Sequence, residues 1–236
     1  MTRREILVGL LDSGIMNLPP ESVKAERRFV LQDSGEVGEI SAEPDILGHG
    51  TELAHILRFH EPHTRIVSAQ IFTISFATSA ATAAAGLRWL IDQKARLINM
   101  SFGLKEDRSV LRDACAMALQ SGAVLLAAAA ARGAAVFPAA YPGVIRITGD
   151  ARCAPGELSV LGTTQADFGA HVRPISTQDD RNGIVGGASY AVAHAAGIGA
   201  SFLRENPGTG AADVRAHFEK SAAYLGPERR SANGNR

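Results

Sequence analysis

Short apolar stretches of strand length alternate along this chain with longer stretches whose apolar residues recur at helical spacing. The first apolar stretch, residues 6–11, ends at Asp12-Ser13-Gly14, a sequence typical of a turn. Residues 32–48 contain many Gly, Asp and Glu residues and are predicted to form a loop. The pattern predicts further strands at 66–71, 97–100, 124–129 and 144–148, and helices at 51–59, 79–94, 110–120, 189–202 and 211–221.

The regular alternation of strands and helices predicts an α/β fold, with a mainly parallel central sheet and helices on both of its faces. No internal repeat, linker or change of composition divides the chain. We therefore predict a single domain over residues 1–226, followed by a polar C-terminal tail at 227–236 that contains Arg229 and Arg230.

The composition of the 236 residues excludes several classes of protein. Apolar residues make up 46% of the chain and charged residues 20%, which argues against disorder. The 24 basic and 24 acidic residues cancel, so no global electrostatic field attracts nucleic acid or an anionic membrane. No apolar run reaches the length of about 18 residues that a membrane-spanning helix needs. We expect neither nucleic acid nor a membrane as a partner.

The first residues and the two cysteines bear on the cellular compartment. Glu5 interrupts the N-terminal apolar stretch, Asp12 ends it, and no small-residue cleavage site follows, so a secretory signal is not expected. Cys115 and Cys153 have no metal-binding spacing and are predicted to be buried structural thiols in a reducing compartment. A cytoplasmic location follows as an expectation.

Three short segments, far apart in the chain, each contain a residue type used in nucleophilic catalysis. They are Leu-Leu-Asp-Ser-Gly with Asp12, Gly-His-Gly-Thr with His49 and Gly-Gly-Ala-Ser-Tyr with Ser189. A serine hydroxyl needs a base within hydrogen-bond reach, and that base needs a group to orient it. Each segment alone also has a structural explanation: a strand that turns, a helix-capping segment, and a serine N-cap.

Taken in the order Asp12, His49, Ser189, these segments resemble the subtilisin-like serine proteases, or subtilases. The resemblance extends over about residues 5–226. It implies a single-domain subtilisin-like fold of three layers. It also implies a serine endopeptidase in which Ser189 attacks a peptide carbonyl, His49 accepts the serine proton, and Asp12 orients His49.

A second stretch that matches the subtilases is Leu-Ile-Asn-Met-Ser-Phe-Gly at 97–103. In the family the backbone of this segment pairs with the substrate and walls the primary specificity pocket. By resemblance, Ser101, Phe102 and Gly103 are therefore substrate-binding residues. Phe102 and the loop at 73–78 are expected to shape the cleft.

The sequence departs from the subtilases at the oxyanion hole. The usual Ala-Ala-Gly-Asn-x-Gly stretch corresponds to Ala-Ala-Ala-Ala-Ala-Arg-Gly at 127–133, so Ala131 stands where the family has asparagine. That asparagine donates to the oxyanion, and its loss costs a subtilisin about 10²–10³ in turnover. The backbone amide of Ser189 remains a candidate donor. Arg132 is a second candidate if its side chain turns inward, the alternative being an arginine in solvent.

Other departures lie near the nucleophile and the base. After His49, Glu52 stands where the family often has a second His, and His55 stands where it has Gly. A metal site is not predicted, because His49 and His55 lie about 240° apart on a helix. We expect no metal and no cofactor, and we interpret His194 as a core histidine. Around Ser189, the usual Thr, Met and Pro are replaced by Ala188, Tyr190 and Ala193.

The leading functional hypothesis is an endopeptidase with narrow substrate choice, such as one that matures a precursor peptide. The missing asparagine motivates the narrow choice, as does the expectation that no inhibitory propeptide precedes the first strand. The expected partners are a peptide or protein substrate and an activating or restraining protein. The alternative is a pseudoprotease that binds peptide as an adaptor or partner subunit with little or no turnover.

Overall fold

A computed structural model describes residues 5–175 and 186–228, so Arg229 and Arg230 of the predicted tail lie outside the described residues. The strands are β1 (Ile6–Asp12), β2 (Val23–Leu31), β3 (Val37–Ile40), β4 (Thr64–Gln70), β5 (Leu97–Met100), β6 (Val124–Ala128), β7 (Ile145–Gly149), β8 (Leu158–Val160), β9 (Phe168–Ala170) and β10 (Tyr224–Leu225). The helices are α1 (His49–His60), α2 (Ala80–Asp92), α3 (Ser109–Gln120), α4 (Ala188–Glu205), α5 (Ala211–Ser221) and a short 3-10 turn, η1 (Pro20–Ser22).

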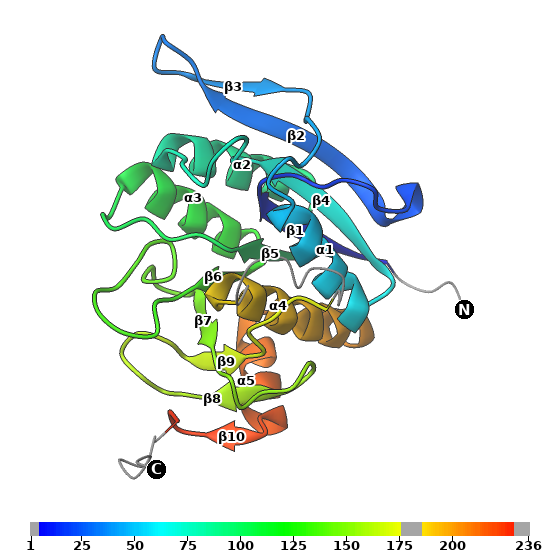
Figure 1. Cartoon of the computed structure of the whole chain (residues 1–236), viewed down its shortest axis with the longest axis vertical. Coiled ribbons are helices and arrows are strands. Elements are labelled where there is room, and N and C mark those ends of the chain that lie inside the picture. Colours follow the sequence, from blue (N-terminus) through cyan, green and yellow to red (C-terminus); the bar gives the residue numbers. More distant parts are fainter. Residues whose placement is uncertain (1–4, 176–185, 229–236) are drawn as a thin grey trace, which may run out of the picture.

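The strands form one sheet in the order β10-β8-β9-β7-β6-β5-β1-β4-β2-β3 (Figure 1). All neighbouring pairs are parallel except β2–β3 and β8–β9. Helices α1, α4 and α5 contribute to the apolar core on one face of the sheet, and α2 and α3 contribute to the core on the other. The predicted α/β fold, with helices on both faces of a mainly parallel sheet, is confirmed.

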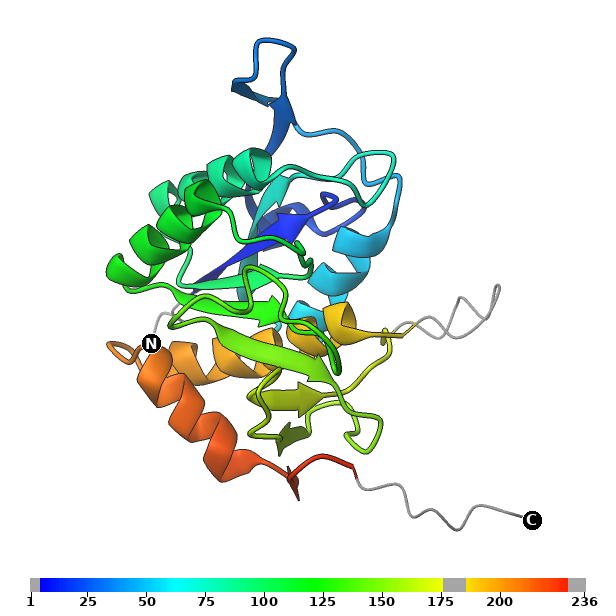
Figure 2. The same cartoon turned by 90° about the vertical axis from the view of Figure 1, so that its left-hand side faces the viewer.

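The predicted helices and the five predicted strands are all present, with ends that differ by at most three residues. The loop predicted at 32–48 is wrong in part, because β3 lies within it and pairs with β2 in an antiparallel hairpin. This hairpin projects from one end of the molecule (Figures 1 and 2). Its outer position explains the error: an edge strand buries few side chains and so lacks the apolar run of a central strand.

Helices α1 and α4 pack against each other in one layer. Their close approach depends on Gly197, where an added Cβ would lie 2.8 Å from the Cβ of His60. Next to this contact, Nε2 of His60 lies 2.8 Å from Nδ1 of His194, and Nε2 of His194 lies 2.9 Å from the carbonyl oxygen of Arg173. A carbonyl can only accept, so His194 carries its proton on Nε2 and its Nδ1 accepts from His60. His194 is thus a hydrogen-bonded core histidine, as predicted.

This histidine pair is expected to make the fold sensitive to mild acid. Burial lowers the pKa of His60 and of His194 from 6.5 to about 4. At pH values between about 4 and 6.5, the unfolded chain binds more protons than the folded one. The free energy of unfolding therefore falls as the pH drops below 6.5. We expect a loss on the order of 2 kcal/mol between pH 7 and pH 5, measured by urea unfolding.

The double variant His60→Gln, His194→Gln should show a much smaller difference between the two pH values, whatever its stability at pH 7. The variant His55→Gln is the control, because His55 is exposed on α1. Equal pH dependence in the double variant and the control would show that other groups are responsible.

Candidate active site

The residues predicted to carry the chemistry lie where neighbouring parallel strands end. Asp12 is the last residue of β1, which lies between β4 and β5. The segment after β4 leads to Phe76, and the segment after β5 begins with Ser101. Because β1, β4 and β5 are parallel, all three carboxyl ends open on the same edge of the sheet, where α/β folds collect their sites.

Asp12 and His49 form a hydrogen-bonded pair at this edge. Oδ1 of Asp12 lies 2.7 Å from Nδ1 of His49 and also accepts from the amide of Ser13 at 2.8 Å. Asp12 is fully buried, and its Oδ2 has no hydrogen-bond partner within the described residues. A carboxylate only accepts, so Nδ1 of His49 carries the proton and Nε2 is left to act as a base.

Asp45, which was not predicted from the sequence to be a functional residue, caps the start of α1 through its carboxylate. Oδ1 of Asp45 accepts from the amide of Gly48 at 2.9 Å, and Oδ2 accepts from the amide and hydroxyl of Thr51 at 2.8 and 2.7 Å. These bonds satisfy amides that have no partner inside the helix. The signal in the sequence was an aspartate shortly before a Gly-His-Gly-Thr segment. Asp45 thereby fixes the residue that follows Gly48, which is His49.

A close contact also brings α1 to the end of β1. The amide of Gly50 donates to the hydroxyl of Ser13 at 2.9 Å, and a Cβ on residue 50 would overlap the carbonyl oxygen of Gly14. Only glycine permits this approach. The small residues beside Asp12 and His49 therefore have a physical role, since they allow the two segments to meet.

The surroundings of His49 favour its protonated form. Burial acts to lower its pKa, but the hydrogen bond and negative charge of Asp12, together with the charges of Asp45 and Glu52, outweigh burial and raise the pKa above 6.5. Such an environment stabilises the imidazolium that forms when a base accepts a proton.

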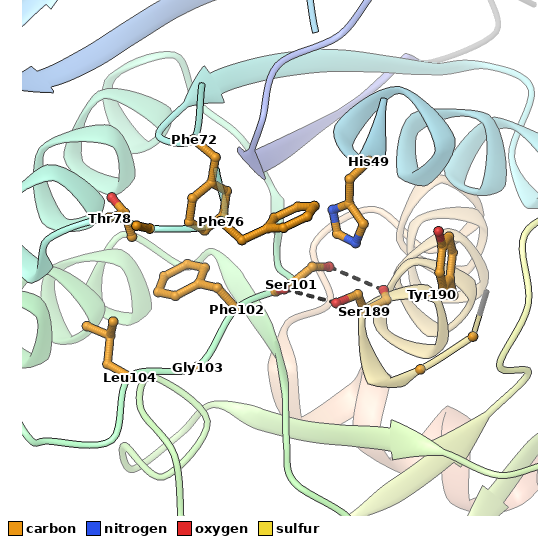
Figure 3. Close-up of a pocket in the computed structure, with 13 residues that line it drawn as sticks. His49, Phe72, Phe76, Thr78, Ser101, Phe102, Gly103, Leu104, Ser189 and Tyr190 are labelled. Carbon is orange, nitrogen blue, oxygen red and sulfur yellow. Dashed lines mark hydrogen bonds between the residues drawn. The ribbon is translucent and has the colours of Figure 1, made fainter. Parts of the chain in front are cut away.

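Ser189 is the second residue of α4, and Gly187 is the N-cap, so Ser189 does not cap the helix. Its hydroxyl donates to the carbonyl oxygen of Ser101 at 3.0 Å, and the hydroxyl of Ser101 donates to the carbonyl oxygen of Ser189 at 3.2 Å (Figure 3). No hydrogen bond joins Ser189 to His49 in this structure. Catalytic hydrogen bonds often form only when substrate is bound, and a rotation of the Ser189 side chain would redirect its hydroxyl.

His49 and Ser189 line one cavity of ≈ 600 Å³ together with the predicted substrate-binding residues Ser101, Phe102 and Gly103 (Figure 3). Residues 76–78 of the predicted cleft loop line it too. The structure thus brings together the predicted nucleophile, the predicted base and the segment after β5. The substrate-binding role of that segment stays a prediction.

Two aromatic side chains flank the imidazole of His49. The ring centroid of Phe76 lies 5.3 Å from that of His49, and the ring centroid of Tyr190 lies 5.7 Å from it, both in edge-on arrangements. Tyr190 stands where the subtilases usually have methionine, whereas nothing in the sequence predicts the contact of Phe76 beyond its place in the cleft loop. Together the two rings restrict how the imidazole can rotate.

The oxyanion region lacks a side-chain donor where the sequence suggested one. Ala131 and Arg132 are both exposed, and neither lines the cavity that contains Ser189. This placement gives no support to Arg132 as a donor. The amide of Ser189 belongs to the first turn of α4, where amides have no partner within the helix, so it stays the predicted donor to an oxyanion.

The remaining candidates lie away from the cavity or take no part in it. His55 is exposed, and the described ranges contain no group of three or more His, Cys, Asp or Glu residues arranged to hold a metal ion. Cys115 and Cys153 are buried and unpaired, and burial raises their thiol pKa values to about 12 and about 11. No helix in the described part of the chain has the length and apolar character needed to cross a bilayer.

A sequence profile of the Subtilase family matches residues 3–234. The chain is 27% identical over 243 residues to the thermostable alkaline protease of Halalkalibacterium halodurans, covering 96% of this chain and 64% of that protein. It is 25% identical over 245 residues to subtilisin E of Bacillus subtilis, covering 95% of this chain and 62% of that protein. The chain therefore spans less than two thirds of the length of these relatives.

Two solved structures illustrate the similarity of fold. Fervidolysin from Fervidobacterium pennivorans, a keratinolytic enzyme related to subtilisin, superposes with a TM-score of 0.67 at 21% identity, covering 94% of this chain and 41% of that one. A lanthipeptide protease superposes with a TM-score of 0.68 at 16% identity, covering 92% and 80%. The central sheet and its helix layers are thus those of subtilisin-like proteins.

Proposed function

The chain belongs to the subtilase family, and from this premise we propose that it is a serine endopeptidase that uses Asp12, His49 and Ser189. The observation that carries the proposal is the 2.7 Å hydrogen bond between Asp12 and Nδ1 of His49, whose imidazole lines the same cavity as Ser189. A fixed tautomer with a free Nε2 is what a general base beside a serine requires.

The reaction would proceed through an acyl-enzyme. Nε2 of His49 takes the proton of Ser189 as Oγ forms a bond to the peptide carbonyl carbon. The resulting oxyanion accepts from the amide of Ser189, and His49 then gives its proton to the leaving amine as the peptide bond breaks. Water, activated by the same base, hydrolyses the ester and restores the serine hydroxyl.

We further propose narrow substrate choice, such as the maturation of one precursor peptide, by an enzyme in a reducing compartment. Support comes from Ala131, which cannot donate to an oxyanion, and from the resting hydroxyl of Ser189, which is bonded to Ser101 instead of His49. Both features favour a low basal rate, which a specific substrate or an activating protein partner would raise. The two unpaired, buried thiols support the reducing compartment.

A fluorophosphonate probe tests the proposed nucleophile, because it forms a covalent bond only with an activated serine. We expect labelling of the wild-type protein and none of Ser189→Ala. Ser109→Ala, which changes an exposed serine at the start of α3, should be labelled like the wild type. If the wild type is not labelled but binds peptide in calorimetry, the result would instead support the alternative function, a pseudoprotease that binds peptide as an adaptor.

The pH dependence of activity provides a second test. His49 must be neutral to accept a proton, and its pKa lies above 6.5. Activity should therefore rise with pH, with the midpoint of its acid limb above 6.5. The quantity to measure is kcat/KM between pH 5 and pH 9, which reports the free enzyme. A midpoint below 6 would show that another group controls the acid limb.

A further inference from the structure

Asn99 is a polar residue at a position where the neighbouring strands carry leucine. It is the third residue of β5 and is fully buried. Its partners in register are Leu10 on β1 and Leu126 on β6, and both belong to the apolar core on the face covered by α1 and α4. Leu97, two residues earlier on the same face of β5, belongs to that core too. Packing alone would therefore favour an apolar residue at position 99.

The side-chain amide of Asn99 makes one hydrogen bond and leaves one buried atom without a partner. Its Nδ2 donates to Oγ of Ser101 at 2.8 Å, whereas its Oδ1 has no hydrogen-bond partner among the described residues. A buried acceptor without a partner lowers the free energy of unfolding, and a leucine would carry no such penalty. What Asn99 supplies and a leucine cannot is the bond to Ser101.

That bond begins a chain of hydrogen bonds that ends at Ser189. Oγ of Ser101 has one proton, which it donates to the carbonyl oxygen of Ser189 at 3.2 Å, so it accepts from Asn99. The hydroxyl of Ser189 in turn donates to the carbonyl oxygen of Ser101 at 3.0 Å, and Figure 3 shows both bonds between the two serines. Asn99 thus fixes the direction of the Ser101 hydroxyl, and that hydroxyl holds the backbone of Ser189.

We propose that Asn99 is a positioning residue for the attack of Ser189, and that it acts through the hydroxyl of Ser101. This role rests on the proposed endopeptidase function. Asn99 itself does not line the cavity. When the Ser189 hydroxyl turns towards His49, the bond from Ser101 to the Ser189 carbonyl can remain, because it uses other atoms. The backbone of the nucleophile then stays fixed while its side chain moves, and a small misplacement of a reacting group lowers the rate strongly.

The test is Asn99→Leu, compared with the wild type in kcat, KM and urea unfolding. We expect kcat to fall about 10- to 100-fold. KM should stay within about threefold, because the lost contact affects the reaction step more than substrate binding. The urea midpoint should not fall, since the leucine joins an apolar row and removes the unpartnered Oδ1. A residue with a merely structural role would change stability and leave kcat of the folded enzyme unchanged.

Two further variants keep the test independent of how well leucine packs. Asn99→Ala removes the same donor without adding bulk and should lose kcat to the same extent, whatever its stability. Met100→Leu is the matched control, because Met100 is the next residue and is buried in the core on the opposite face of the sheet. Its kcat should equal that of the wild type. Unchanged kcat in both Asn99 variants would overturn the inference and leave the endopeptidase function standing.

A double-mutant cycle tests whether Asn99 acts through Ser101. Ser101→Ala removes the hydroxyl but keeps the backbone carbonyl that accepts from Ser189. It should lower kcat about as much as Asn99→Leu, and the double variant should lose no more than Ser101→Ala alone, because both changes remove the same contact. Losses that multiply in the double variant would show that Asn99 does not act through Ser101, and would overturn the inference.

If the wild type cleaves no peptide and is not labelled by the fluorophosphonate probe, the proposed function fails, and hydrogen–deuterium exchange decides whether Asn99 positions Ser189. The amides at 191–193, in the turn that follows Ser189, should exchange faster in Asn99→Leu and in Ser101→Ala than in the wild type. Met100→Leu should match the wild type. Equal exchange in all four proteins overturns the inference.

Discussion

Replacement of His49 by alanine is expected to lower kcat about 10⁶-fold, the size of the loss when the corresponding base is removed from a subtilisin. The structure gives the physical reason. His49 is the described group on the cavity wall that is both hydrogen-bonded to a buried carboxylate and left with a free ring nitrogen. Without it, the serine hydroxyl has no acceptor for its proton when it attacks.

The measurement is the rate of cleavage of a peptide that the wild-type protein cleaves, at saturating concentration, with the free energy of unfolding measured in parallel. His55→Ala, on the exposed side of the same helix, should retain full activity. A loss in His49→Ala of less than about tenfold, with the fold intact, would exclude His49 as the general base.

Replacement of Asp12 by asparagine is expected to lower kcat about 10⁴-fold. An asparagine amide can donate to Nδ1 of His49, which would place the imidazole proton on Nε2 and remove the base. The hydrogen bond and charge of Asp12 also raise the pKa of His49, so the residual activity of Asp12→Asn should have its acid limb at lower pH than the wild type.

Asp12→Ala provides the comparison for this second variant. It removes the misdirecting amide along with the carboxylate, so its imidazole is free to take either tautomer and its kcat should exceed that of Asp12→Asn. Equal rates in the two variants would mean that orientation by charge, not the tautomer, is the main contribution of Asp12.

The central part of the fold follows from the sequence because its strands are buried on both faces. The strand predicted at 97–100 and the helix predicted at 211–221 have the observed bounds of β5 and α5, and Asp12 lies at the end of β1 as the turn signal predicts. Local sequence patterns are sufficient to predict an element where its helical or strand periodicity is clear and where it does not lie at the edge of the sheet. The meeting of Asp12 with His49 could be predicted from the resemblance but not from either segment alone.

The rest depends on contacts that local patterns do not encode. Strand β2 carries four charged residues and β3 is only four residues long. Strands β8, β9 and β10 have two or three residues each, too few for a period to be visible. The capping role of Asp45 requires a bend of the chain back onto α1. The hydroxyl of Ser189 pairs with Ser101, 88 residues away, and this choice of partner depends on the docking of α4 beside β5.

The oxyanion region shows the limit of motif comparison. An alignment identifies which side chain is missing at Ala131 but does not say what takes its place. The structure shows Arg132 exposed and outside the cavity, so the amide of Ser189 in the first turn of α4 stays the predicted donor. A site that stabilises its oxyanion chiefly with backbone amides should be slow unless binding energy from the rest of the substrate is used in the transition state.

The close contact between Gly197 and His60 limits which sequences can carry this chemistry. Each of the two helices that meet there carries one proposed reacting group in its first turn, the imidazole of His49 on α1 and the hydroxyl of Ser189 on α4. Any side chain that wedges these helices apart would widen the gap between the groups by a fraction of an ångström without altering either. Substitutions at the contact of Gly197 with His60 are therefore limited by their effect on the rate of the proposed reaction as well as by helix packing.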